Sequence, residues 1–182
     1  MIRSIRLPAA VDRLDNAVDQ LLEPVRDNSR MNWIMNRASA AGDWSKVWHV
    51  IGIISAVRRR RPSDAVVLSV LLGLESLIVN QGVKRLFRRD RPTTTGDHRS
   101  QVRTPSTSSF PSGHASAAAF ALTIVSRRSG PKVAWALAPV ALLVAYSRVH
   151  VRLHHLSDVV AGAAMGHVLG RLFTVRRVLT RR

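Results

Sequence analysis

The sequence predicts an all-α protein, a multi-helix bundle of apolar helices embedded in a membrane. Three observations indicate this class. Long uncharged apolar runs alternate with clusters of arginine along the 182 residues. Ala, Gly and Ser are frequent in these runs, as is usual where helices approach one another closely in lipid. No segment shows the alternation of apolar and polar residues that is typical of a half-buried strand.

The first expected helix is amphipathic. Its apolar residues recur at spacings of three and four: Val11, Leu14, Val18, Leu21 and Val25. This pattern predicts about four turns of helix with one apolar face, which lies on a membrane surface or covers other helices. We assign residues 1–42 to an N-terminal amphipathic helical region that includes a short helix near residues 33–38. We expect no cleaved signal peptide.

The core region is expected to span residues 43–175 and to contain about five membrane helices. Their apolar runs are residues 47–57, 65–83, 116–125, 133–146 and 159–173. Flanking Ser, Trp and Arg can extend the shorter runs toward the roughly 20 residues that a spanning helix needs. The alternative is a helical bundle buried in a soluble protein.

Two further segments differ from these runs in composition. Residues 93–110 are rich in Thr, Ser, Arg and Pro, and an irregular loop of this length in a compact domain usually has a function. Residues 176–182 are expected to form a basic C-terminal tail.

The charge balance indicates an anionic partner. The chain has 28 Lys and Arg against 11 Asp and Glu, a net charge of +17, which attracts nucleic acid, anionic lipid or a phosphorylated substrate. The arginines cluster at helix ends, and this argues against nucleic-acid binding, where one helix face would carry them. The absence of cysteine excludes disulfides and thiolate metal sites.

Three segments at expected helix ends carry the residues for catalysis. They are VKRLFRRDRP (83–92), PSGH (111–114) and SRVHVRLHHLSD (147–158). Ser112 is a good N-cap, Gly113 allows a ligand to approach the backbone, and a helix N-terminus attracts an anion. In an up-and-down bundle all three segments meet at one face, where cations and the helix N-terminus would surround a phosphate beside two histidines and a carboxylate.

The order and spacing of these segments resemble the signature of the type 2 phosphatidic acid phosphatases, which share a helical core with vanadium haloperoxidases. Lys84 is followed after six residues by Arg91 and Pro92, Pro-Ser-Gly-His ends at His114, and Ser147-Arg148 is followed after five residues by His154 and after three more by Asp158. The resemblance extends over about residues 43–173.

The resemblance implies a role for each matching position. His154 would be the nucleophile that forms a phosphohistidine, Asp158 would hold its other nitrogen, and His114 would protonate the leaving group. The residues that would bind the phosphoryl oxygens are Lys84, Arg91, Ser112, Gly113 and Arg148. Fixed cations then stabilise the transition state without a metal or cofactor.

The expected function is an integral membrane phosphatase that hydrolyses a lipid-linked phosphate or diphosphate, such as polyprenyl diphosphate or phosphatidate. A phosphotransferase or a vanadate-dependent haloperoxidase on the same fold is the alternative, and a basic nucleic-acid-binding helical protein is a more distant one. The expected partners are the lipid phosphate substrate and membrane lipids, without nucleic acid. The sequence leaves the specific lipid and the oligomeric state open.

The distribution of basic residues predicts a multi-pass protein of the cell membrane with its active site on the extracytoplasmic face. Once the phosphate-binding cations are set aside, the helix ends opposite the motifs are the more basic, and positive loops favour the cytoplasm.

Several other charged residues are open to interpretation. Arg85, Arg88 and Arg89 are expected to face lipid headgroups, and Glu75 to pair with an arginine or histidine. His150 and His155 have no role in the resemblance. His150 and His154, four residues apart, could bind zinc together with His155 or Asp158, but no nearby acidic cluster completes such a site. Four residues are candidates for binding a second phosphate or a sugar: His98, Arg99, Arg103 and Arg152.

Overall fold

The computed structural model describes residues 3–4, 7–93, 97–100, 102 and 104–175, and it is predominantly helical. The helices are α1 (Ala9–Arg26), α2 (Ser29–Gly42), α3 (Lys46–Arg58), α4 (Ser63–Ser76), α5 (Lys84–Leu86), α6 (Gly113–Ser129), α7 (Pro131–His150) and α8 (Leu156–Val175). The short 3-10 turn η1 (Asp43–Ser45) joins α2 to α3, and the π-helical segment η2 (Leu77–Val83) joins α4 to α5. The two-residue strands β1 (Arg3–Ser4) and β2 (Phe87–Arg88) pair in parallel. The all-α class is confirmed, and each predicted apolar run lies in a helix.

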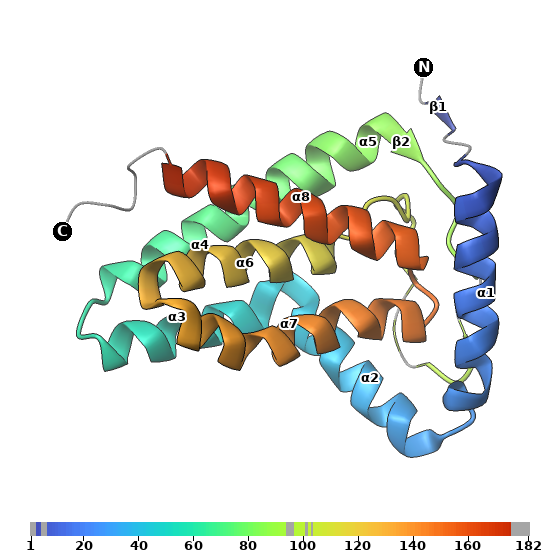
Figure 1. Ribbon diagram of the computed structural model, residues 1–182, viewed down its shortest axis with the longest axis horizontal. Coiled ribbons are helices and arrows are strands. Elements are labelled where there is room, and N and C mark those ends of the chain that lie inside the picture. Colours follow the sequence, from blue (N-terminus) through green and yellow to red (C-terminus); the bar gives the residue numbers. More distant parts are fainter. Residues whose placement is uncertain (1–2, 5–6, 94–96, 101, 103, 176–182) are drawn as a thin grey trace.

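The long helices form a bundle with α1 lying across one end of it (Figure 1). The α3–α4 and α6–α7 connections lie at the far end of the bundle from α1, whereas the α7–α8 connection lies next to α1. The core includes Trp48 of α3, Leu72 of α4 and Phe120 and Ile124 of α6, all at most 2% exposed. This arrangement brings the three predicted motif segments to the end of the bundle that α1 covers.

Helix α6 is held in place by a close approach of α8. Gly162, Gly166 and Gly170 recur every four residues and therefore share one face of α8. A Cβ at Gly162 would collide with the carbonyl oxygen of Ser112, and one at Gly166 with that of Ser116. Glycine at these positions lets the two backbones touch, which fixes the N-terminus of α6 against α8.

Helix α1 attaches to the bundle partly through charged residues, in contrast to the expected apolar face. Asp15 and Arg26 are buried, whereas Leu14 is 55% exposed and Leu21 is 74% exposed. Val18 and Leu22 pack against a small apolar cluster of α6, α7 and α8 residues. The outward leucines give α1 the exposed apolar positions of a helix that lies at a membrane interface.

Two described helical stretches, Ser63–Leu86 and Pro131–His150, are long and apolar enough to cross a membrane. Large apolar side chains are also exposed on α3, α7 and α8, for example Val57 (72%), Leu142 (69%) and Leu172 (57%). Such surfaces are typical of helices that face lipid. Membrane spans for α3, α6 and α8 stay a prediction, and the predicted basic tail, residues 176–182, lies outside the described residues.

Candidate active site

A cavity of about 320 Å³ opens where the three motif segments meet. The predicted site residues that line it are Lys84, Arg91, Gly113, His114, Arg148 and His154. The two others lie directly behind its wall, with Ser112 and Asp158 both fully buried. The structure therefore brings together every residue that the sequence assigned to catalysis or phosphate binding.

Three cations of the cavity lack carboxylate partners. Lys84 lies in the last turn of the continuous helical stretch Ser63–Leu86 (α4, η2 and α5, here called the α4–α5 helix), Arg148 lies in the last turn of α7, and Arg91 follows β2. None of them has a carboxylate within 4.0 Å among the described ion pairs. Instead, Arg148 donates to the Ser39 hydroxyl. Unpaired cations converging on one cavity form a site for a phosphoryl dianion.

Arg91 also fixes the loop that borders the cavity. Its Nη1 donates to the carbonyl oxygen of Leu153 at 2.5 Å, and its Nε to that of Pro105 at 3.1 Å. One guanidinium thus joins the described part of the 93–110 loop to the residue that precedes His154.

The N-terminus of α6 presents Gly113 to the cavity. Ser112 caps the helix, with Oγ accepting a hydrogen bond from the Ala115 amide at 3.4 Å, while its own amide donates to the carbonyl oxygen of Asp158 at 3.0 Å. Because these groups of Ser112 are used inside the protein, its direct contact with phosphate stays a prediction. At Gly113 a Cβ would lie 2.6 Å from Oδ1 of Asn80, so a larger residue there would displace the Asn80 side chain.

His154 lies in the α7–α8 connection and is 2% exposed. Its Nδ1 is 3.7 Å from Oδ2 of Asp158, close for an ion pair but longer than a hydrogen bond. Burial holds the pKa of His154 well below its usual range, and the nearby cations Arg148 and Lys84 lower it further, against the opposing effect of Asp158. A neutral imidazole can attack phosphorus.

Arg89 is part of the site, which corrects the expectation that it faces lipid headgroups. Its Nη1 donates to Oδ1 of Asp158 at 2.5 Å and to Oγ of Ser157 at 2.7 Å. Its Nη2 donates to Oδ2 of Asp15 at 2.7 Å. The same guanidinium thus supports the carboxylate behind His154 and attaches α1 to α8. The neighbouring Arg85 and Arg88 are exposed, and their contact with lipid headgroups stays a prediction.

Asp43 is the site residue that sequence reasoning missed. Its Oδ1 lies 3.0 Å from Nε2 of His114, and this contact lowers the pKa of Asp43. Gly42 allows the approach, because a Cβ there would lie 2.5 Å from the His114 ring. Trp44 and Ser45 then turn the chain with φ of 54° and 57°. No motif marks a carboxylate 71 residues away from its histidine.

Glu75 has a different partner from the expected arginine or histidine. Its carboxylate accepts a hydrogen bond from the Ser116 hydroxyl, and Glu75 also lines the catalytic cavity. Ser116 belongs to α6. The sequence predicted that α4 and α6 lie in the same bundle, but it did not predict which face of α6 meets Glu75.

The remaining basic residues hold α1 and the loop in place. Arg152 pairs with Asp19 at 2.5 Å, and Arg99 pairs with Glu23 at 2.7 Å. The pKa of Asp97 is lowered by its hydrogen bond with Arg99. Both arginines are therefore occupied by carboxylates. Of the two other candidates for a second phosphate or a sugar, His98 has an exposed side chain and Arg103 lies outside the described residues.

The possible zinc ligands diverge in the structure. Nε2 of His150 lies 2.8 Å from Oδ1 of Asn32, and Nε2 of His155 lies 3.3 Å from the carbonyl oxygen of Asp90. Within the part of the chain that the structure describes, no three His, Cys, Asp or Glu residues are grouped to hold a metal ion.

Comparison with known proteins places this geometry in a family. The model of the PAP2 superfamily matches residues 64–181. A decaprenylphosphoryl-5-phosphoribose phosphatase of Mycobacterium tuberculosis (strain ATCC 25618 / H37Rv) is 31% identical over 131 residues, which are 69% of this chain and 68% of that protein. The protein of the same name from Mycolicibacterium smegmatis is 33% identical over 125 residues, 66% of this chain and 65% of its own length.

A solved structure shows the same fold. The crystal structure of a transmembrane PAP2 type phosphatidylglycerolphosphate phosphatase from Bacillus subtilis superposes with a TM-score of 0.73 and 23% sequence identity, covering 96% of this chain and 90% of that one. The match includes α1 and α2, which lie outside the region of the family model.

Proposed function

The chain belongs to the PAP2 superfamily, and from this premise we propose that it is an integral membrane phosphatase that hydrolyses a lipid-linked phosphate through a phosphohistidine intermediate. The observation that carries the proposal is the position of His154. It is buried, burial lowers its pKa below the usual histidine value, and it lines a cavity with a second histidine and three cations that have no carboxylate partner among the described residues. These are the parts that a metal-independent phosphoryl transfer needs.

The substrate that we propose carries a terminal phosphate ester on a hydroxylated headgroup. The names of the relatives describe a phosphoribose and a phosphatidylglycerol phosphate. In both, a phosphate monoester is attached to a unit with free hydroxyls, and a phosphodiester joins that unit to the lipid. Polyprenyl diphosphate and phosphatidate lack this hydroxylated unit, and they are the comparison substrates.

In the proposed reaction, Nε2 of His154 attacks phosphorus while the bond to the ester oxygen breaks. His114 donates a proton to the departing alkoxide. Lys84, Arg91 and Arg148 bind the phosphoryl oxygens, where losing one such contact typically costs about 10²- to 10³-fold in rate. Asp158 stabilises the positive charge that forms on His154.

The second half of the reaction regenerates the enzyme. His114, now neutral, removes a proton from water, and the resulting nucleophile attacks the phosphohistidine. The phosphorus–nitrogen bond breaks and inorganic phosphate leaves. Water and the lipid alcohol thus approach the phosphorus from the same side, where His114 lies.

We also propose that α3, the α4–α5 helix, α6, α7 and α8 span the membrane, with the active site on the extracytoplasmic face. The exposed apolar side chains of α3, the α4–α5 helix, α7 and α8 and the basic far end of the bundle support this arrangement, with α6 as the buried central helix. Helix α1 would then lie in the outer interface with Leu14 and Leu21 toward lipid.

Release of inorganic phosphate by the purified, detergent-solubilised protein tests the proposal. The panel contains phosphatidylglycerol phosphate, a polyprenylphosphoryl phosphoribose, polyprenyl diphosphate and phosphatidate, each assayed with excess chelator. We expect release from at least one lipid and an acid-labile phosphoenzyme in rapidly quenched samples. His154→Ala should lack both, whereas His98→Ala, which changes a histidine that is 90% exposed, should keep both.

Three results would contradict parts of this proposal. Activity that requires added zinc or magnesium would exclude the metal-independent mechanism. A phosphoenzyme that persists in His154→Ala would exclude this nucleophile. Transfer of phosphate to an acceptor lipid without release of inorganic phosphate would identify a phosphotransferase.

A further inference from the structure

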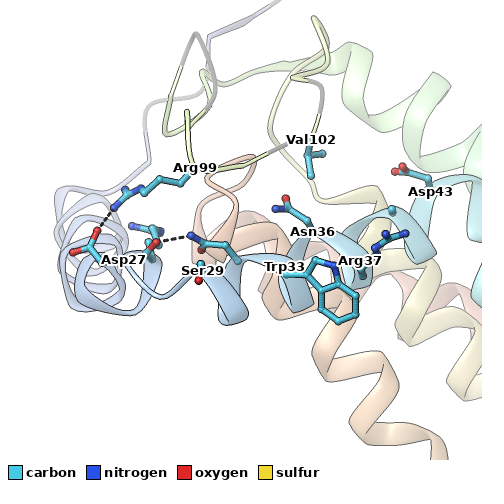
Figure 2. A pocket seen from close by; sticks show the side chains of 11 residues that line it. Asp27, Ser29, Trp33, Asn36, Arg37, Asp43, Arg99 and Val102 are labelled. Carbon is cyan, nitrogen blue, oxygen red and sulfur yellow. Dashed lines mark hydrogen bonds and ion pairs between the residues drawn. The ribbon is translucent and has the colours of Figure 1, made fainter.

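A second, larger cavity of about 780 Å³ lies beside the catalytic cavity, along one face of α2 (Figure 2). The residues of α2 and its end that line it recur at helical spacing: Ser29, Asn32, Trp33, Asn36, Arg37, Ala40 and Asp43. Arg99 and Val102 from the loop lie opposite this face. This cavity, here called the α2 cavity, has no role in the chemistry described so far.

A hydrogen-bonded pair links the linings of the two cavities. Asp43 lines the α2 cavity and His114 lines the catalytic cavity, and the two side chains lie 3.0 Å apart. Anything that extends from the catalytic cavity past His114 therefore reaches Asp43 and then the face of α2.

The direction of the reaction makes this contact informative. In phosphoryl transfer the attacking and leaving atoms lie roughly in line on opposite sides of phosphorus. His154 attacks from one side, and His114 protonates the leaving oxygen on the other. The group attached to the leaving oxygen then lies on the His114 side of the phosphorus, and Asp43 is the next residue on that side.

We propose that the α2 cavity binds the polar part of the leaving group, namely a hydroxylated unit followed by a phosphodiester anion. This inference rests on the proposed function. It names the α2 cavity as the binding site of the hydroxylated headgroup, which a simple lipid phosphate such as phosphatidate lacks. Asp43 and Asn36 contact the hydroxyls, and Arg37 contacts the phosphodiester.

The hydrogen-bonding state of the lining residues supports this division. Asn32 is occupied, because its Nδ2 donates to the carbonyl oxygen of Arg26 at 2.6 Å and its Oδ1 contacts His150. Among the hydrogen bonds of the described residues, Asn36 uses Oδ1, as the acceptor of the Ser100 hydroxyl at 2.9 Å, and its Nδ2 donates to none of them. The carboxylate of Asp43 retains Oδ2 as an acceptor for a hydroxyl.

The charges of the lining residues identify the anion site. Arg26 and Arg99 are paired with carboxylates of α1 at 2.7 Å. Arg37 has no carboxylate within 4.0 Å among the described ion pairs, and its guanidinium lies 5.6 Å from the centre of the Trp33 ring. A cation stacked on an indole stays oriented and keeps its N–H groups free for a phosphodiester.

The spacing agrees with a short headgroup. Arg37 and Asp43 are six residues apart along the helix, which corresponds to about 9 Å of axial rise. A glycerol or a ribose between two phosphates can bridge such a distance, whereas a phosphatidate has no second phosphate to reach Arg37.

The test compares two substrates with the same acyl chains, phosphatidylglycerol phosphate and phosphatidate, in mixed micelles. For Arg37→Gln we expect kcat/KM for phosphatidylglycerol phosphate to fall about tenfold, the value of one charged hydrogen bond of roughly 1.5 kcal/mol, through a higher KM. Phosphatidate turnover should stay at the wild-type level, which also shows that the variant is folded. Asn36→Ala should shift the ratio in the same direction.

Arg30→Gln is the matched control, because Arg30 is an exposed arginine of the same helix outside the cavity. It should leave both substrates unchanged. Equal losses for both substrates in Arg37→Gln, or no loss for either, would overturn the α2 cavity as the headgroup site while the proposed phosphatase activity stands. If the wild-type protein releases phosphate from none of the lipids, the proposed function fails and this inference fails with it.

Discussion

Arg89 donates a hydrogen bond of 2.5 Å to Oδ1 of Asp158, whose other carboxylate oxygen lies 3.7 Å from Nδ1 of His154. The same guanidinium reaches Asp15 on α1 at 2.7 Å. His154, the proposed nucleophile, is therefore held by a series of charged contacts that begins at Asp15 on α1, a helix that carries none of the three motif segments. This relationship makes Arg89 a positioning residue, one step removed from the reacting atoms.

Replacing Arg89 should impair catalysis and stability together. Arg89→Ala leaves two buried carboxylates without their partner, which typically costs about 3–5 kcal/mol of unfolding free energy. Misplacement of His154 should lower kcat by about 100-fold. Steady-state kinetics and thermal unfolding measure both effects.

Arg88→Ala is the matched control, since Arg88 is the exposed neighbour of Arg89. Arg89→Lys, which keeps the charge, should recover part of kcat. If Arg89→Ala and Arg88→Ala lowered kcat equally, Arg89 would have no specific role in positioning His154.

Removing His114 should affect poor leaving groups far more than good ones. An acid is needed where the leaving alkoxide is basic, so His114→Ala should slow hydrolysis of a lipid phosphate by about 10²- to 10⁴-fold. Hydrolysis of p-nitrophenyl phosphate should fall much less, because its phenolate leaves without a proton. Equal losses for the two substrates would show that His114 is not mainly a leaving-group acid.

The low pKa of His154 predicts activity that persists into mildly acidic solution. Attack on phosphorus requires the neutral imidazole, and burial lowers the pKa of His154. Protonation then inactivates the enzyme only below the ordinary histidine value of about 6.5, so the acid limb of kcat/KM against pH should lie below it.

The pH profile needs two substrates whose phosphate groups ionise at different pH. A limb that stays in place for both belongs to the enzyme. If the acid limb that both substrates share lies above about pH 6.5, the pKa of His154 is not lowered by burial, and this prediction is wrong.

The sequence predicted the site well where the evidence was local and less well where it depended on contacts between helices. The order of apolar runs was sufficient to place Lys84, His114 and His154 at one end of a bundle. The roles of Arg89 and Asp43 depend on which side of a helix meets which neighbour, and spacing along the chain does not encode that. The proposed boundary between residues 42 and 43 illustrates the limit, because it divides two residues that contact the same histidine.

The close packing of α6 on α8 should tolerate no added methyl group. In Gly166→Ala the new Cβ would collide with the backbone of Ser116, and such overpacking typically costs about 1–3 kcal/mol. Gly73→Ala is the matched control, because a Cβ at Gly73 meets nothing within 4 Å. Thermal unfolding in detergent should separate the two variants, and similar melting temperatures would contradict the close α6–α8 contact.

The orientation in the membrane can be decided with single cysteines, since the natural chain has none. The far end of the bundle carries basic residues in short connections: Arg58, Arg59, Arg60, Arg61, Arg127, Arg128 and Lys132. Positive connections of this kind favour the cytoplasm, so the active-site end should face outward. In intact cells a membrane-impermeant thiol reagent should label Ser106→Cys, in the loop near the active site, and spare Ser129→Cys, at the far end. Both cysteines should react after the cells are permeabilised, which controls for accessibility. Labelling of Ser129→Cys alone in intact cells would place the active site in the cytoplasm.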